Sequence, residues 1–514
     1  MKNFQTIRRV FYEIHLWLGI VSGIIVFLVC LSGAALVFRE EVAHFLEPKK
    51  YYVDVPANTP RIPIDELLAK LESENPGMKA ASVTIPEKAN RTISIMFSQP
   101  APQGSGGFGR GEQREGGQRE QSGERSQRQR GPNAQGSGSS ERGGQREGGE
   151  QRGERREGQE RGSRPRGEGQ DARGERTPRE GAPRQGSGPG GFGRGKMFLV
   201  NPYTAEVVGE GMGSPADSFF RSMMGLHRTL WISYRLPNLG PRATLGGLIV
   251  GIATIVFVVI VLSGLVLWLP RTWKSFAKWR AWKPGFKVRF RKGFWALTYD
   301  IHNTAGFYLL IPTLILALTG LCWSFGWYRN AASYVLGDQI FKQRMQRPEK
   351  IEPVENGTQP LSVGKMIERQ NKLTPGAGDM SISIPGDNET AMVIQKGRTG
   401  FFALSIKDKT QWDRYRGTVI PVEHFGKTVE VERFVDKPLG AKIATAVRTL
   451  HFGDVTGTSS KIVFFIACLF ATSFPVTGVA LWIKKLRRRY IKRRKEREAK
   501  NAIENEKSSE VVEK

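Results

Sequence analysis

Four long apolar stretches constrain the fold of this chain more than any other feature. They span residues 16–38, 245–269, 305–327 and 462–483. The hydrocarbon core of a bilayer is about 30 Å thick, and a helix needs roughly 20 apolar residues to cross it. Each stretch is therefore predicted to be a transmembrane helix. The chain is expected to be an α-helical membrane protein, since a single soluble globule cannot accommodate four such stretches.

Basic side chains mark one side of the membrane. Lys and Arg gather in the short segments beside these helices, residues 1–15, 270–304 and 484–514. Because short loops rich in Lys and Arg stay in the cytoplasm, both termini and the link between the second and third helices are predicted to be cytoplasmic. Residues 39–244 and 328–461 then lie outside. The expected location is the bacterial inner membrane, with several passes through the lipid bilayer.

Both external segments have the pattern of small α+β modules. In each, a helix-like stretch precedes short alternating runs that Gly and Asp separate, which is typical of antiparallel strands. The first module is predicted over residues 39–100 and 197–214, and the second over residues 328–437. An amphipathic segment follows each module, at residues 215–244 and 438–461.

The insert at residues 101–196 has a different composition. It contains no Leu, Ile, Val or Met and only two aromatic residues, Phe108 and Phe192. Such a segment cannot bury enough apolar surface to offset its loss of entropy on ordering, so it is predicted to be disordered. Its Gly-Gly-Phe-Gly-Arg-Gly runs neither follow a strand nor open a helix, which excludes a phosphate loop. Acidic residues are interspersed with the arginines, and the insert is predicted to lie outside the cell, so no nucleic-acid partner is expected.

The chain repeats itself. In the first apolar helix Ile precedes His15 and Gly19 follows four residues later; in the third, Ile precedes His302 and Gly306 follows at the same spacing. The second and fourth helices also match each other, and a Leu-His pair precedes each of them. The sequence therefore predicts a tandem repeat of helix, external module, helix.

Four of the six histidines fall at equivalent positions of this repeat. With the orientation above, His15 and His302 lie at the cytoplasmic ends of their helices. His227 and His451 lie on the amphipathic segments just outside the second and fourth helices. The four are therefore predicted to form two pairs, one at each face of the membrane.

Two histidines at one depth on neighbouring helices suit a six-coordinate haem b, because each imidazole offers one nitrogen to the iron. Gly19 and Gly306 lie one turn beyond His15 and His302, where they would leave room for the ring or for a neighbouring helix. Ionisable residues near a membrane span cost insertion energy and usually carry a role. Two haems at opposite faces would form a route for electrons across the bilayer.

Packing remains an alternative for these histidines, because a single His at a membrane boundary is commonly interfacial and duplication explains the paired positions by descent. A transition-metal site fits less well, since no cluster of Asp, Glu or Cys accompanies the pairs. His44 and His424 have no repeat partner and are expected to have no role of this kind. His227 stands 37 residues before Gly264, and His451 only 27 before Gly478, so the outer pair depends on how the longer connection folds.

A Ser-Gly or Thr-Gly pair recurs in all four apolar helices, at residues 32–33, 263–264, 319–320 and 477–478. Small residues at such positions usually allow close helix packing, with the hydroxyl bonded to a carbonyl of its own helix. We interpret these pairs as packing residues.

Other cofactor chemistry is excluded by what the sequence lacks. The three cysteines form no CxxC pair, which excludes thiolate zinc sites, iron–sulfur clusters and thioredoxin chemistry. The cytoplasmic segments contain no Ser-His-Asp arrangement, HExxH, phosphate loop or Rossmann fingerprint and are too short for a nucleotide domain. An oxidoreductase built this way would take electrons from another protein or from a membrane quinol.

Six motifs in this order resemble the PepSY-associated transmembrane proteins, often called iron-regulated membrane proteins. They are Ile14-His15-Leu-Trp-Leu-Gly19, Leu226-His227-Arg-Thr-Leu230, Ser263-Gly264-Leu-Val-Leu-Trp268, Asp300-Ile-His302-Asn-Thr-Ala-Gly306, Leu450-His451-Phe-Gly453 and Thr477-Gly478-Val-Ala-Leu-Trp482. Residues 201–209 resemble the strand–turn–strand that closes the family's PepSY-like module, with Ala205 where Gly is usual. The resemblance covers nearly the whole chain except the insert.

Members of that family include inner-membrane reductases that carry two b-type haems and pass electrons to periplasmic ferric siderophores. The resemblance implies His15, His227, His302 and His451 as the haem ligands. The leading hypothesis is a di-haem b oxidoreductase that reduces an external acceptor, most plausibly a ferric siderophore or chelate. The alternative is a non-enzymatic PepSY-type protein that inhibits or scaffolds an external partner such as a peptidase. A metal transporter ranks last, because the helix interiors offer only Ser, Thr and Cys.

Overall fold

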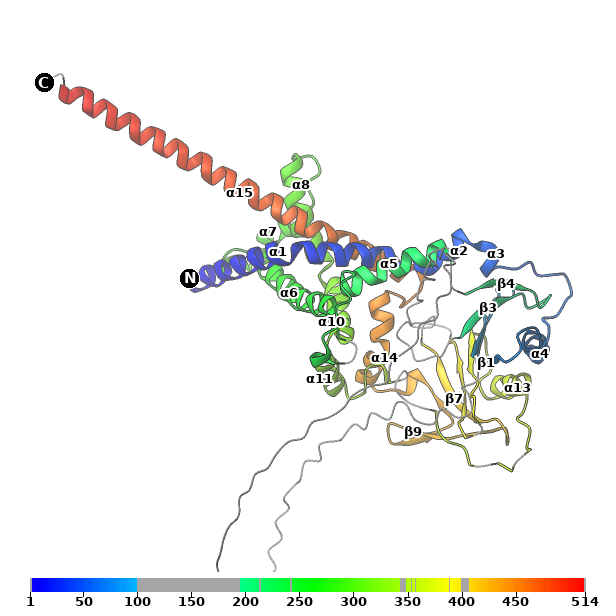
Figure 1. Cartoon of the computed structure of the whole chain (residues 1–514). Helices are drawn as coiled ribbons and strands as arrows, with labels where there is room; N and C mark the ends of the chain where they lie inside the picture. Colours follow the sequence, from blue (N-terminus) through cyan, green and yellow to red (C-terminus); the bar gives the residue numbers. More distant parts are fainter. Residues whose placement is uncertain are drawn as a thin grey trace, which may run out of the picture. The chain divides into compact units, whose positions relative to one another are not determined.

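The computed structural model describes residues 2–98, 195–211, 214–240, 243–342, 348–352, 354–355, 357–387, 389–398 and 406–512 (Figure 1). The predicted disorder of the insert lies outside the described residues, except that Lys196 begins a strand. Residues 1–101 and 192–514 belong to one compact unit.

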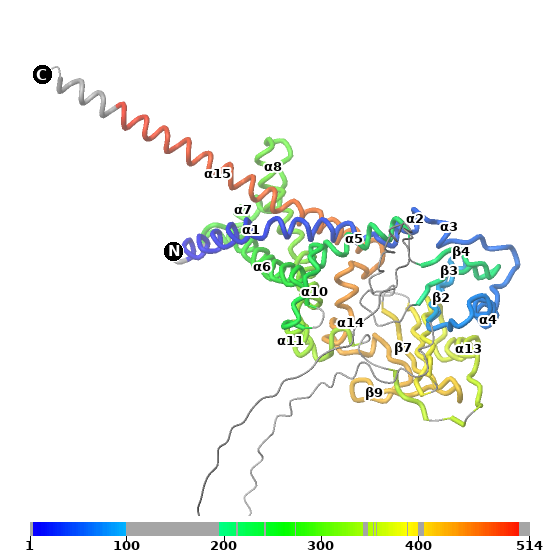
Figure 2. The backbone as a smooth tube through the Cα atoms, viewed as in Figure 1, coloured from blue at the N-terminus to red at the C-terminus, as the bar shows by residue number. Residues whose placement is uncertain are grey.

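Three helices are long and apolar enough to cross a membrane, within the part of the chain that the structure describes. They are α1 (Lys2–Val37), α6 (Leu245–Trp268) and α15 (Thr458–Val512). A fourth crossing results if the bent pair of segments Phe294–Tyr308 and Leu310–Ser324 counts as one span. The first and last helices of the chain, α1 and α15, run side by side (Figure 2). The protein is therefore a multi-pass membrane protein in contact with lipid.

The bent pair, called the third span below, begins before residue 305, where the sequence predicts the span to start, and it has a kink of the kind expected from Pro312. It comprises α8 (Phe294–Asp300), a π-helical turn (Ile301–Ala305), α9 (Gly306–Tyr308) and α10 (Leu310–Ser324), with a bend of 65° at Leu309. Pro312 explains the bend, because proline has no N–H to donate to the carbonyl four residues earlier. The link predicted over residues 270–304 is correspondingly shorter, and it contains the short helical turns Trp273–Ser275, Trp279–Trp282 and Lys283–Phe286.

Shorter helices flank the spans at the end of the bundle where the chain leaves for the strands. These helices are α2 (Arg39–Leu46), α3 (Pro48–Tyr51), α5 (Pro215–Thr229), α11 (Gly326–Leu336) and α14 (Leu439–Phe452). Ser214 caps α5 by accepting a hydrogen bond from the backbone N–H of Asp217. Two of them, α5 and α14, lie in the segments predicted to be amphipathic.

Strands from both of the segments that are predicted to be external join in one sheet instead of two separate ones. Among the described residues nine strands follow the order β11-β7-β6-β5-β1-β2-β3-β4, with β8 beside β7, and neighbouring strands are antiparallel. The two segments meet where β1 pairs with β5, for example at Val83 and Ile382. The strands are β1 (Lys79–Ile85), β2 (Ile93–Ser98), β3 (Lys196–Val200), β4 (Val207–Glu210), β5 (Met380–Ser383), β6 (Met392–Lys396), β7 (Asp408–Asp413), β8 (Thr418–Val419) and β11 (Val431–Glu432), and a separate hairpin pairs β9 (Val422–His424) with β10 (Lys427–Val429).

One hydrophobic core serves both segments. Helices α4 (Ile64–Glu74) and α13 (Val363–Leu373) pack on the sheet, and their apolar side chains share a cluster with strand residues of both segments. Leu67 and Met366 are fully buried there. The carboxylate of Asp65 accepts a hydrogen bond from the N–H of Gly364, which joins the two helices. The two predicted modules therefore form one folded body.

Candidate functional site

The structure brings the four repeat-equivalent histidines together in two pairs. His15 of α1 and His302 of the π-helical turn form the terminus-side pair, with ring centres 6.0 Å apart. His227 of α5 and His451 of α14 form the sheet-side pair, with ring centres 6.1 Å apart. The names refer to the end of the bundle that carries the chain termini and the end from which the chain leaves for the sheet. Each pair takes one histidine from each half of the repeat.

His15 rests against the second span. Its Nδ1 lies 3.0 Å from the carbonyl oxygen of Ile260 and 3.0 Å from Oγ of Ser263. The next residue is Gly264, where a Cβ atom would lie only 3.2 Å from Cε1 of the ring. The Ser-Gly pair therefore forms a seat for the histidine, with a hydroxyl beside Nδ1 and no side chain beneath Cε1.

His302 has the same kind of seat on the fourth span. Its Nδ1 lies 2.9 Å from Oγ1 of Thr477, and a Cβ at Gly478 would lie 3.4 Å from Cε1. The turn that carries His302 is held in place by the buried side chain of Asp300. That carboxylate accepts hydrogen bonds from the backbone N–H, Nε and Nη2 of Arg289, at 2.8, 2.8 and 2.6 Å. The basic link is thereby tied to the turn that carries His302.

The sheet-side histidines are seated in the same way, on the first and third spans. Nδ1 of His227 lies 2.9 Å from the carbonyl oxygen of Val29 and 3.4 Å from Oγ of Ser32. The ten extra residues after His227 do not displace it. They fold into a short connection with Leu230 and Trp231 in the left-handed region and a bridge from Arg235 to Thr244.

His451 completes the set. Its Nδ1 lies 3.0 Å from Oγ1 of Thr319 and 3.2 Å from the carbonyl oxygen of Leu316. Added Cβ atoms would lie 3.1 Å from Cε1 of His227 at Gly33 and 3.2 Å from Cε1 of His451 at Gly320. The sequence-based interpretation of the Ser/Thr-Gly pairs as packing residues was thus incomplete. The sequence does contain one signal for these seats. The Ser/Thr-Gly pair recurs in all four apolar stretches, just as histidine recurs at four equivalent positions of the repeat.

The seats connect the helices of each half reciprocally. In the first half His15 of α1 is seated on α6, and His227 ahead of α6 is seated on α1. In the second half His302 is seated on α15, and His451 ahead of α15 is seated on α10. Each half is therefore cross-braced at both faces, and the two halves meet at the histidine pairs.

A cavity of about 1080 Å³ opens beside the terminus-side pair. His15 and His302 line it together with Gly19 and Gly306. A Cβ at Gly19 would meet nothing within 4 Å, and one at Gly306 would meet only the Phe474 ring, at 3.9 Å. These two glycines, predicted as space-makers near the histidines, border the cavity and leave it open.

Cationic side chains surround the outer part of this cavity. Arg8 donates to the carbonyl oxygens of Leu267 and Leu269 at the end of α6. Two lysines stand over aromatic rings, with Nζ of Lys484 4.6 Å from the centre of Trp295 and that of Lys485 3.9 Å from the centre of Tyr12. The cations that line the cavity are Arg8, Arg9, Arg271, Lys484, Lys485, Arg488, Arg489 and Lys492.

The model of the PepSY-associated TM region matches residues 12–485 of this chain. The chain belongs to this family. The resemblance inferred from the sequence motifs is thereby confirmed over the region that contains all four paired histidines. A comparison with curated proteins finds no match.

In this PepSY-associated TM protein, aromatic side chains connect the sheet-side pair to the chain that follows α11. The ring centre of Trp323 lies 4.9 Å from that of His451 and 4.6 Å from that of Phe341. Phe341 has a backbone φ of 65°, a left-handed conformation that costs energy for a bulky residue. The fold holds it there because its neighbour Ile340 is fully buried against Ala444 and Val447 of α14.

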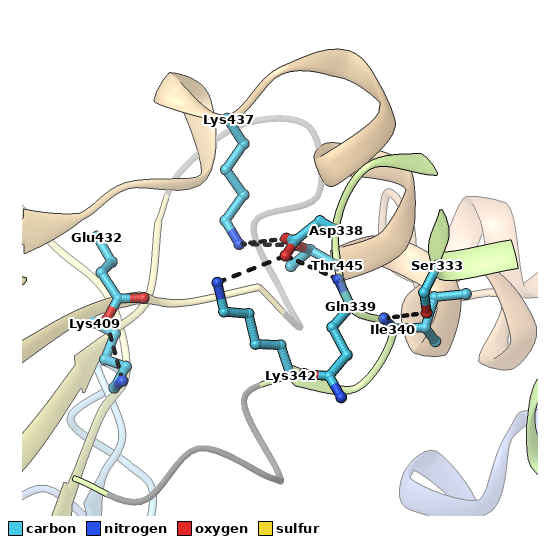
Figure 3. Close-up of polar contacts among 9 residues, drawn as sticks. All are labelled: Ser333, Asp338, Gln339, Ile340, Lys342, Lys409, Glu432, Lys437 and Thr445. Atoms are coloured by element: carbon cyan, nitrogen blue, oxygen red, sulfur yellow. Dashed lines mark hydrogen bonds and ion pairs between the residues drawn. The ribbon is translucent and has the colours of Figure 1, made fainter. Parts of the chain in front are cut away.

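An ionic network anchors the start of α14 close to these aromatic residues. Figure 3 shows Lys342 and Lys437 reaching the carboxylate of Asp338, whose side chain is only 6% exposed, with N–O distances of 3.7 and 3.9 Å. Nζ of Lys437 also donates to Oγ1 of Thr445 on α14, at 2.9 Å. Burial lowers the pKa of Lys437, and the nearby Asp338 opposes that shift.

The two remaining histidines join neither pair. Nε2 of His44 lies 3.1 Å from Nη2 of Arg91, and burial together with Arg91 lowers the pKa of His44. His424 is buried in β9, and its Nε2 has no hydrogen-bond partner among the described residues. No group of three or more His, Cys, Asp or Glu residues that could hold a metal ion occurs in the described ranges.

Proposed function

We propose that this chain is a membrane oxidoreductase that holds one b-type haem at each histidine pair and carries electrons across the bilayer to an external acceptor. The observation that carries the proposal is the spacing of the paired rings, 6.0 and 6.1 Å between centres. Two imidazoles on opposite sides of one metal, each with its nitrogen about 2 Å from it, place their ring centres about 6 Å apart.

The donor set also suits haem. Each pair supplies two imidazoles, and no group of three or more His, Cys, Asp or Glu residues occurs in the described part of the chain, which would suit a group such as haem that needs only two protein ligands. When bound, haem iron takes up and releases one electron at a time. The protein's part is to seat both rings of a pair at a separation that matches axial ligation.

The cavity supports haem binding at the terminus-side pair. Gly19 and Gly306 leave its wall flat, as a planar ligand requires, and its volume is at the upper end of the range for ligand pockets. The surrounding cations, Arg488 and Arg489 among them, suit the two carboxylates of a haem b. An apolar pocket with cations around it is thus complementary to both the apolar ring and the carboxylates of haem b.

The side of the donor follows from the orientation that the basic segments predict, and the acceptor follows from the family resemblance. With Lys and Arg concentrated at the terminus side, that side is cytoplasmic by the positive-inside rule, and the donor is a cytoplasmic protein or a quinol. The acceptor on the other side is a ferric siderophore or another ferric chelate. Reduction releases the metal because iron(II) binds hard oxygen ligands more weakly than iron(III).

The test is a dithionite-reduced minus air-oxidised absorption spectrum of the purified protein, with pyridine haemochrome quantitation. Two six-coordinate b-type haems per chain are expected, followed by ferric-chelate reduction in proteoliposomes. Protein made with ample haem that contains none would overturn the proposal and leave the external sheet as a binding module for a partner such as a peptidase.

A further inference from the structure

The four histidine seats permit an accounting of hydrogen atoms. A serine or threonine hydroxyl has one hydrogen to donate, and a carbonyl oxygen has none. Each seat hydroxyl is within donating distance of a carbonyl of its own helix: Ser263 of Ile260 at 2.8 Å, Ser32 of Leu28 at 2.7 Å, Thr319 of Ile315 at 2.6 Å and Thr477 of Ser473 at 3.0 Å. With that hydrogen used, the hydroxyl oxygen can only accept from the histidine.

At three of the seats a backbone carbonyl oxygen also lies beside Nδ1, and it too can only accept a hydrogen bond from the ring. Nδ1 of His227 lies 2.9 Å from the oxygen of Val29, and Nδ1 of His15 lies 3.0 Å from that of Ile260. His451 has the equivalent contact with Leu316 at 3.2 Å. An unprotonated Nδ1 would place a lone pair against a carbonyl oxygen, which is repulsive. The hydrogen must therefore be on Nδ1.

We infer that the four Ser/Thr-Gly pairs are positioning residues that hold each paired histidine as the Nδ1–H tautomer and leave the Nε2 lone pair for a ligand between the rings. A neutral imidazole has one donor and one acceptor nitrogen, so fixing one fixes the other. No described residue forms a hydrogen bond with Nε2 of His15, His227, His302 or His451. The identity of the ligand rests on the proposed function, whereas the tautomer does not.

Glycine is the second half of each seat. A Cβ would approach Cε1 to between 3.1 and 3.4 Å, which is tighter than an ordinary contact. An alanine would therefore require the ring to shift from its place beside the hydroxyl. Only glycine lets the ring reach the hydroxyl while the pair keeps its spacing.

The seats differ in one respect that a test can use. The hydroxyl of Thr477 makes the shortest of the four contacts with Nδ1, at 2.9 Å, whereas that of Ser32 makes the longest, at 3.4 Å. When the outer N–H of a metal-bound imidazole donates a hydrogen bond, the ring becomes a stronger metal ligand, which stabilises the oxidised metal. Removing the Thr477 hydroxyl is therefore expected to have a larger effect than removing that of Ser32, where the carbonyl of Val29 remains at 2.9 Å.

The first experiment needs no haem. Nitrogen-15 spectra of the full-length, haem-free protein with labelled histidine report which ring nitrogen carries the hydrogen. The four paired histidines are expected as the Nδ1–H tautomer, assigned by the loss of one signal in each His→Gln variant. Nε2–H tautomers at the paired positions would overturn the inference. Wild-type protein that has Nδ1–H rings but takes up no haem when haem is supplied would leave the inference intact and defeat the proposed function instead.

The second experiment uses Thr477→Val, which keeps shape but removes the hydroxyl. We expect a changed His302 nitrogen signal and, in the haem-loaded protein, a more positive midpoint potential of one haem only. Thr477→Ser should restore both. Thr472→Val is the matched control, because Thr472 lies on the same helix and its hydroxyl donates to the backbone carbonyl oxygen of Cys468, at 2.8 Å, and not to a histidine. Equal effects of the two valine variants, or no effect of Thr477→Val, would show that the hydroxyl has only a packing role.

Discussion

The two histidine pairs are seated alike but surrounded differently. The terminus-side pair borders a cavity of about 1080 Å³ with cations around it. The sheet-side pair lies on short helices outside the spans, where His451 packs against Trp323 and α14 is anchored through Lys437 and Asp338. The repeat relates the two rings within each pair and not one pair to the other, so the same kind of seat recurs at both pairs although their surroundings differ. Both pairs have the same ring spacing and the same kind of seat. They differ in the side chains and the space around the rings, and therefore in what can approach them.

Two kinds of substitution should distinguish the effect of the seats from the effect of their surroundings. A change in a seat is expected to act on one pair alone, because every seat belongs to one histidine. A change in the surroundings should affect one face through packing or charge and leave the seats at the other face intact.

Removing one ligand of each pair should give the largest effect. His302→Ala is expected to lose the terminus-side haem and keep the other, and His451→Ala the reverse, since a haem with one axial imidazole is held far more weakly. Pyridine haemochrome quantitation and reduced-minus-oxidised spectra measure the outcome. Loss of both haems in both variants, with folding intact by circular dichroism, would contradict the independence of the two pairs.

Alanine at a seat glycine should weaken haem binding at one face even though it favours the helix. Ala is better than Gly in a helix interior by about 1 kcal/mol, so the two effects oppose each other. The expected loss is larger for Gly33→Ala, where a Cβ would lie 3.1 Å from His227, than for Gly478→Ala, where it would lie 3.4 Å from His302. Haem content and melting temperature, measured together, distinguish a displaced ring from a damaged fold.

The parts of the molecule that the sequence predicts are those coded locally. An apolar stretch of about 20 residues specifies a span by its own length, and the repeat places His15 opposite His302 and His227 opposite His451 without knowledge of the packing. The family resemblance follows from the same local motifs. Spans, repeat and candidate pairs are therefore accessible from the amino-acid sequence alone.

Features that depend on distant partners are not accessible in this way. The single sheet requires β1 to pair with β5, and alternating apolar residues give each strand a face but not a neighbour. The seats are visible as dipeptides, yet which histidine Ser263 meets depends on how α1 packs on α6. The tie between Asp300 and Arg289 was missed for the same reason, because it forms only when the link folds back.

Breaking that tie should affect the terminus side alone. Asp300→Asn keeps the shape of a buried residue but weakens three charge-assisted hydrogen bonds to Arg289, and hydrogen bonds to charged groups are worth about 1.5–3 kcal/mol each at most. We expect a lower melting temperature and easier loss of the haem at His302, with the sheet-side haem unchanged. Asp338→Asn is the matched change at the other face. If Asp338→Asn eased loss of the haem at His302, the expectation that each face is stabilised separately would be wrong.

The smallest expected effect concerns pH, and it is confined to the sheet side. Burial, followed by the nearby cation of Lys437, lowers the pKa of His424 below its ordinary value. The unfolded chain therefore binds a proton that the folded chain does not, in the range from the usual histidine pKa of about 6.5 down to the lowered value. The free energy of unfolding should fall as pH drops through this range. Thermal melts of the wild type and of His424→Gln between about pH 7.5 and about pH 5, which bracket the ordinary histidine pKa of about 6.5, measure this difference. The variant should lose part of the pH dependence while both haem spectra stay unchanged, because His424 touches neither pair. A wild-type slope that survives His424→Gln in full would assign the acid sensitivity to other groups and remove this distinction between the two faces.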